Sequence, residues 1–163
     1  MELKRELLEI LAQNARATVA DMAVMTGADE AAVSVAIAEM EADRVIVTYH
    51  TLIDWDKMGV ETVQALIEVR VTPQRDRGFD EIARRIYGFS EVSSVYLMSG
   101  AYDLMVLIEG ATMRNVAFFV AEKLSTIDGV LSTATHFVLK KYKDRGVMLD
   151  EDSGPDGRLA VTP

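Results

Sequence analysis

The residues best suited to bind a small polar molecule gather in two places. Between two predicted strands lie the backbone amides and hydroxyls of Ser99 and Tyr102, the open position Gly100 and the carboxylate of Asp103. On a later predicted strand the hydroxyls of Ser132, Thr133 and Thr135 follow one another closely. An amino acid needs donors for its carboxylate, an acceptor for its ammonium group and an apolar wall for its side chain. All three are present, so these residues predict an amino-acid-sized site.

The first group lies inside a predicted hairpin. Apolar residues alternate on both faces of its two strands, so both faces are expected to be covered. Gly100 can take the positive φ that a tight connection needs, and its missing side chain leaves room for a ligand or another backbone. Asp103, beside an apolar run, must face solvent, cap backbone amides or meet a partner. The alternative that Gly100 and Asp103 only form the turn stays open.

The sequence gives little support for metal binding, nucleophilic catalysis or a nucleotide-binding motif. His50 and His136 are the only histidines, neither has a partner at metal-ligand spacing, and the chain has no cysteine. No nucleophile triad, P-loop or GxGxxG motif is present. We therefore predict no metal, no cofactor and no enzymatic activity.

The N-terminal third has the pattern of a DNA-binding helix pair. Helices are predicted over 3–14, from the N-cap Thr18 to Met25, and from the N-cap Asp29 to Ala42. The spacing of Ala23, Gly27 and Val33 fits a helix-turn-helix, in which a small residue permits the crossing and glycine makes the turn. Val45–Tyr49 and Leu52–Trp55 are predicted to pair as a wing. The alternative is a three-helix packing module without DNA contact.

The charges of this segment are unusual for DNA binding. Residues 1–53 hold four Lys or Arg against nine Asp or Glu, a net charge of −5. The available contacts to phosphates and bases are Lys4, Arg5, Arg16, Arg44 and the hydroxyl of Ser34. The outward positions of the third helix are predicted to be Asp29, Glu30, Ala31, Ser34, Val35 and Ala38, without Arg, Lys, Asn or Gln.

The remaining elements predict an α+β domain. After a linker at 54–60, the order over 61–143 is strand, helix, strand, strand, helix, strand, which indicates a ferredoxin-like βαββαβ sheet with both helices on one face. The other face also carries apolar groups, which predicts a homodimer through the open sheets. These groups are Leu66, Tyr96, Met98, Met105, Leu107 and Val138. Residues 144–163 are predicted to be a flexible acidic tail, with Val147–Leu149 able to pair at an edge.

Composition agrees with a globular oligomer. Half of the 163 residues are hydrophobic, and no apolar run reaches the roughly 18 residues of a membrane span. Without a secretory pattern or cysteine, the expected location is the cytoplasm.

Four segments together resemble the Lrp/AsnC, or feast/famine, family of prokaryotic transcription regulators. They are LLEILAQNARATVADMAVMTG, ADRVIVTYHTLIDWDKMG, SGAYDLMVLIEG and IDGVLSTATHFVLKKYK, within 3–143. The resemblance implies a winged helix-turn-helix followed by a RAM effector domain, dimers formed through the sheets, and often octamers built from dimers. It also implies an amino-acid effector site at Met98, Ser99, Gly100, Tyr102 and Asp103 with Ser132, Thr133 and Thr135.

We therefore predict a DNA-binding regulator that senses an amino-acid-like effector, which acts by binding one assembly state more tightly. Two alternatives remain. The first is a sensor subunit that has lost DNA binding and co-assembles with a paralogue. The second is an enzyme like the haem-pathway decarboxylases that share this fold, which would need His136 and Arg84 or Arg85 gathered around a tetrapyrrole.

Overall fold

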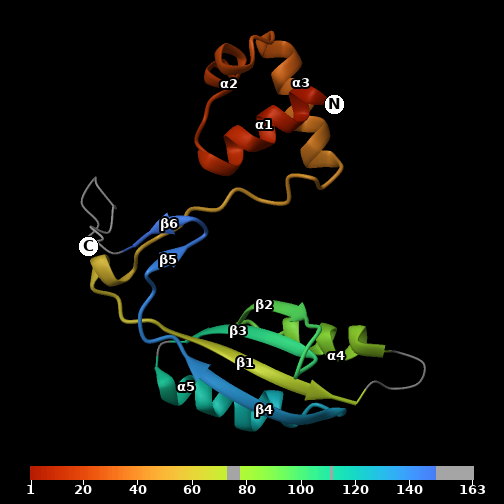
Figure 1. Ribbon diagram of the computed structural model, residues 1–163, viewed down its shortest axis with the longest axis vertical. Helices are drawn as coiled ribbons and strands as arrows, with labels where there is room; N and C mark the ends of the chain where they lie inside the picture. The colour runs from red at the N-terminus through yellow and green to blue at the C-terminus, as the bar shows by residue number, and fades with distance from the viewer. Residues whose placement is uncertain (73–77, 111, 150–163) are drawn as a thin grey trace, which may run out of the picture. The chain divides into compact units, whose positions relative to one another are not determined.

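Three helices form the first part of the chain (Figure 1). They are α1 (Glu2–Gln13), α2 (Val19–Thr26) and α3 (Glu30–Ala42). The computed structural model describes residues 1–72, 78–110 and 112–149. The chain divides into two units, Met1–Ile53 and Asp54–Pro163.

Local sequence signals fix the ends of α2. The hydroxyl of Thr18 accepts a hydrogen bond from the backbone N–H of Asp21 at 3.1 Å, and the Asp21 carboxylate accepts one from the N–H of Thr18 at 3.1 Å. This capping box holds the pKa of Asp21 below its usual value, because the hydrogen bonds favour the charged form. Gly27 ends the helix with a φ of +70°. Asp29 occupies the N-cap of α3, but its side chain makes no capping bond.

The crossing of α2 and α3 confirms the predicted helix-turn-helix. Ala23 is 7% exposed and Val33 is fully buried, so the small and the branched residue meet in the core as their spacing indicates. The other buried members are Leu7, Met22, Ala36 and Met40. One apolar core therefore holds all three helices.

The predicted wing ribbon is not formed. Residues 45–55 contain no strand. Instead, the N–H groups of Val45 and Ile46 both donate to the carbonyl of Met40, at 2.8 and 3.0 Å, and fold the chain back onto the end of α3. Ile46 packs against the helical core, whereas Val45 and Val47 are exposed. A two-stranded ribbon with so little apolar support is only marginally stable, which explains the difference.

The second unit contains a four-stranded antiparallel sheet in the order β2-β3-β1-β4. Its strands are β1 (Val63–Val71), β2 (Val92–Leu97), β3 (Leu104–Gly110) and β4 (Val130–Phe137). β1 lies between β3 and β4 (Figure 1), with Ile67 opposite Val106 on one side and Thr135 on the other. This is the ferredoxin-like arrangement that the sequence predicts.

Two helical segments cover one face of the sheet. They are α4 (Gly78–Tyr87) and α5 (Met113–Phe118), which continues into the π-helix η2 (Phe119–Leu124). Their side chains Ile86, Phe119 and Leu124 pack against the fully buried Ala65, Ile67 and Val69 of β1. Val116 and Phe119 are buried, whereas Ala117 is exposed. The wider π turn, in which Ser125 N–H bonds the carbonyl of Val120 at 2.9 Å, shifts the phase of the helix.

The ends of the second unit carry small elements. A 3-10 turn, η1 (Asp56–Met58), lies in the predicted linker. Beyond β4, β5 (Lys143–Asp144) pairs with β6 (Val147–Met148) as a separate hairpin. Part of the predicted tail is therefore ordered, and its residues 150–163 lie outside the described residues.

Two glycines give a direct test of this backbone. Gly129 has a φ of +92°, and a Cβ there would lie 2.8 Å from Cδ1 of Ile82, whereas a Cβ at Gly100 would meet nothing within 4 Å. Gly129→Ala should lower the free energy of unfolding by about 1–3 kcal/mol, because it combines left-handed strain with a clash. Urea denaturation of both variants checks this. Gly100→Ala, the control, should cost nothing measurable; equal losses would contradict the structure.

Candidate functional site

Asp103 ties the loop between β2 and β3 to the end of β1. Its carboxylate accepts a hydrogen bond from the backbone N–H of Val71 at 2.9 Å. Its own N–H donates to the carbonyl of Val69 at 3.1 Å, and its carbonyl accepts from the N–H of Met98 at 2.8 Å. The sequence left three possibilities for this carboxylate: facing solvent, capping a backbone amide or meeting a partner. The structure shows that it caps a backbone amide. The remaining oxygen lone pairs can still face a ligand.

The hydroxyls of β4 are divided between the two faces of the sheet. Thr133 and Thr135 pair with Val69 and Ile67, whose side chains face the helices, whereas Ser132 pairs with Arg70 on the open face. Since successive strand residues alternate, the three hydroxyls do not form one row. The Oγ1 of Thr133 lies 3.5 Å from the Oγ of Ser125, on the helix side.

The loop and the first half of β4 nevertheless meet at one end of the sheet. Asp103 bonds Val69 and Val71, and the same stretch of β1 pairs with Val130, Ser132 and Thr133 on its other side. The two groups of predicted binding residues, about 30 positions apart in the chain, thus flank the end of β1. Thr135 lies two residues farther along β4, away from this end.

The 98–103 loop has free space beside Gly100, and the Tyr102 side chain is directed toward the sheet. Gly100 does not use the positive φ that glycine can take, because the turn spans several residues and needs no left-handed glycine. Open space surrounds its Cα, as the ligand hypothesis requires. The Tyr102 hydroxyl donates to the sulfur of Met105 at 3.8 Å, which places it toward the open face of the sheet. Ser99 and Gly100 are exposed, while Met98, Tyr102 and Asp103 are half-buried.

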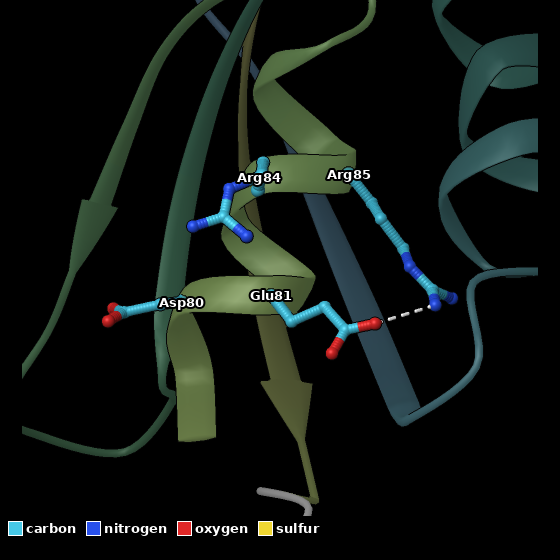
Figure 2. Close-up of a pocket in the computed structure, with 4 residues that line it drawn as sticks. All are labelled: Asp80, Glu81, Arg84 and Arg85. Atoms are coloured by element: carbon cyan, nitrogen blue, oxygen red, sulfur yellow. Dashed lines mark hydrogen bonds and ion pairs between the residues drawn. The ribbon is translucent and has the colours of Figure 1, made fainter. Parts of the chain in front are cut away.

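Two cavities lie elsewhere. One, of about 580 Å³, is lined by Asp80, Glu81, Arg84 and Arg85 of α4 (Figure 2). There Glu81 pairs with Arg85 at 2.9 Å, and Arg84 points to the other side, beside Asp80. The second, of about 430 Å³, lies between α1 and α2 and includes Ile10, Val24 and Met25. Neither contains a loop residue of 98–103.

The arrangement required by the decarboxylase alternative is absent. His136 lies on the open face of the sheet, where its Nε2 is 3.3 Å from the Glu68 carboxylate. Arg84 and Arg85 belong to α4, which covers the opposite face. Within residues 1–72, 78–110 and 112–149 no three His, Cys, Asp or Glu side chains are grouped to hold a metal. In the same residues no helix is long and apolar enough to cross a membrane.

The outer surface of α3 has the composition that the sequence indicates. All six predicted outward residues, 29–31, 34, 35 and 38, are exposed. Val35 is 58% exposed, while Val33, Ala36 and Met40 face the core. The helix thus presents two carboxylates near its N-terminus and an apolar surface beyond them. Ser34 is the one hydroxyl among these six residues.

Two of the cations predicted to contact DNA form ion pairs with carboxylates. The Lys4 ammonium lies 2.7 Å from the Glu39 carboxylate, and this hydrogen bond raises the pKa of Lys4. Arg5 pairs with Glu9 at 2.9 Å. Arg16 and Arg44 are exposed at the two ends of the helix-turn-helix, and Arg44 has a φ of +56° just after α3. Sequence spacing could reveal the i,i+4 pair of Arg5, but the Lys4–Glu39 contact depends on how α1 crosses α3.

Two family models match the two units. Residues 2–47 match the winged helix-turn-helix DNA-binding model, and residues 64–148 match the Lrp/AsnC ligand binding domain model. A DNA-binding unit joined to a ligand-binding unit defines a transcriptional regulator that senses an effector, and not an enzyme. The alternative of a sensor without DNA binding is not favoured.

Relatives specify the family. The chain is 51% identical to the HTH-type transcriptional regulator YugG of Bacillus subtilis, over 99% of this chain and 98% of that protein. It is 28% identical to the HTH-type transcriptional regulator LrpA of Pyrococcus horikoshii, over 87% of this chain and 98% of that protein. The solved structure of Escherichia coli AsnC shares the fold with a TM-score of 0.71 at 22% identity, covering 90% of this chain and 97% of that one. The chain belongs to the Lrp/AsnC family of transcription regulators.

The hydrogen bond between Asp103 and Val71 can be tested by its contribution to stability. Asp103→Ala leaves the N–H of Val71 without its carboxylate acceptor, so the free energy of unfolding should fall by about 1–3 kcal/mol. Asp103→Asn keeps a side-chain oxygen in place and should cost clearly less. Thermal denaturation compares the two variants. Equal losses would mean that the charge, not the hydrogen bond to Val71, stabilises this end of the sheet.

Proposed function

We propose that an amino acid binds at the end of β1, between the 98–103 loop and the start of β4, and alters subunit assembly. The observation that carries this is the convergence of Asp103 and Ser132–Thr133 on the two sides of Val69–Val71. The Asp103 carboxylate would accept from the ammonium group. Exposed loop amides and the Ser132 hydroxyl would donate to the carboxylate, and the open space at Gly100 admits the ligand.

The assembled form that we propose is at least a dimer through the open sheet face. Helices cover the face of Ile67 and Val106, whereas α4, α5 and η2 leave the face of Leu66, Met105 and Leu107 uncovered. Tyr96, on the same face, is 50% exposed. A second copy would cover this surface, since an apolar patch on a sheet face is otherwise left in water. The ligand site near its edge would then sense contacts between subunits.

A structural relative guides the choice of ligand. The transcriptional regulator NMB0573 of Neisseria meningitidis, which has a TM-score of 0.73 and 21% identity to this chain, was solved as a complex with L-Met. We therefore place methionine first among the amino acids to test. A regulator of this kind acts where chromosomal DNA is, so we propose a cytoplasmic location.

Light scattering tests the sensing site. The mass of the purified protein should change on adding one of the twenty amino acids, because a ligand that binds one assembly state more tightly shifts the population toward it. Asp103→Asn should abolish the shift while the protein stays folded. Glu122→Gln, which removes a charge from an exposed position of η2, is the control and should respond normally. A response that survives Asp103→Asn would contradict the proposed ammonium contact.

Salt dependence tests the phosphate contacts. Binding to a random-sequence duplex should weaken as salt rises, with a slope of log K against log salt of about −0.9 for each phosphate contacted. Arg16→Ala should reduce that slope by about one for each subunit engaged. Arg114→Ala removes the same charge from α5 of the other unit and should leave the slope unchanged. An unchanged slope in Arg16→Ala would exclude this arginine from the DNA contact.

A further inference from the structure

The middle of α3 presents an apolar side chain where a DNA-reading helix presents its contacts. Val35 is 58% exposed, within the first two turns of the helix. Ala31 and Ala38 lie one turn before and after it and are also exposed. The opposite side of the helix, with Val33 and Ala36, is buried against α2 and α1. Core packing therefore directs Val35 outward and leaves most of its side chain exposed.

Hydrogen-bond readout of bases does not fit this surface. Base edges are usually read by Arg, Lys, Asn or Gln, and none of these stands among the six outward residues. Asp29 and Glu30 repel phosphates, so they do not anchor the helix to the backbone. Among these six residues Ser34 offers one hydroxyl, and the remaining side chains, Ala31, Val35 and Ala38, are apolar. The major groove offers one apolar group, the C5-methyl of thymine.

We propose that Val35, flanked by Ala31 and Ala38, reads thymine methyl groups in the major groove and so determines sequence specificity. The two alanines are short enough to let the helix backbone approach the base pairs, and the branched Val35 reaches farther and covers the methyl. This inference rests on DNA binding through the helix-turn-helix. It adds that the discrimination comes from buried methyl groups and not from hydrogen bonds to base edges.

The test begins with a duplex selected by the full-length protein from a random library at low salt. Each thymine of the selected duplex is then replaced by deoxyuridine, which removes only the C5-methyl and keeps base pairing. Affinity for the deoxyuridine duplex should fall about four-fold for each methyl contacted, the factor that corresponds to the transfer of one CH₂ group. The ratio of the two affinities measures methyl readout directly.

Val35→Ala should lower this thymine-to-deoxyuridine ratio toward one and leave the affinity for the deoxyuridine duplex unchanged. Alanine is the better helix former, so the variant should fold. Val24→Ala is the matched control, since it removes the same atoms from an 85% exposed position on α2 and should keep the wild-type ratio.

Three results would overturn the inference, and they are distinguishable. Equal losses of Val35→Ala on both duplexes would show that Val35 does not contact the methyl. Binding with a thymine-to-deoxyuridine ratio of one in the wild type would refute methyl readout but leave DNA binding intact. No binding to any duplex at low salt would refute both the inference and the DNA-binding step on which it rests.

Discussion

The pairing of β1 on both sides is the constraint on which the second unit depends. One face of this strand, with Ala65, Ile67 and Val69, is fully buried beneath the helices, so a register slip of one residue would expose the whole row. With β1 fixed, β3 and β4 are fixed beside it, and so are the loop that precedes β3 and the hydroxyls of β4. Asp103 secures the same end through a side chain. The register of β1 with β3 and β4 therefore sets the positions of the candidate effector-binding residues.

Much of this architecture could be predicted from residue patterns. The alternation in β1 gives its limits and its buried face, and the spacing of Ala23, Gly27 and Val33 gives the helix crossing, because period and steric fit are local properties. The wing could not be predicted correctly from Val45–Tyr49. Its β-branched residues favour a strand, but the carbonyl of Met40 takes the amides that the ribbon needs.

Residue chemistry alone selects the candidates for an amino-acid site, and their assignment stays a prediction. The sequence does not show that the N–H of Val71 donates to Asp103, because that contact spans 32 positions. Strand alternation separates Ser132 from Thr133 and Thr135, but which of them faces the helices follows from the pairing of β4 with β1. The same holds for the surface predicted to contact DNA. Its composition was evident from the sequence, but the pairing of Lys4 with Glu39 depends on the helix packing.

The excess of carboxylates in residues 1–53 also affects the rate at which this unit would encounter DNA. A unit of net charge −5 repels a polyanion at long range, so encounter is slower than the electrostatically steered association of basic domains. Moderate salt screens that repulsion beyond about 8 Å. Association should therefore become faster as ionic strength rises, while the bound state becomes shorter-lived. Such a regulator depends on its residence time on the target more than on rapid search.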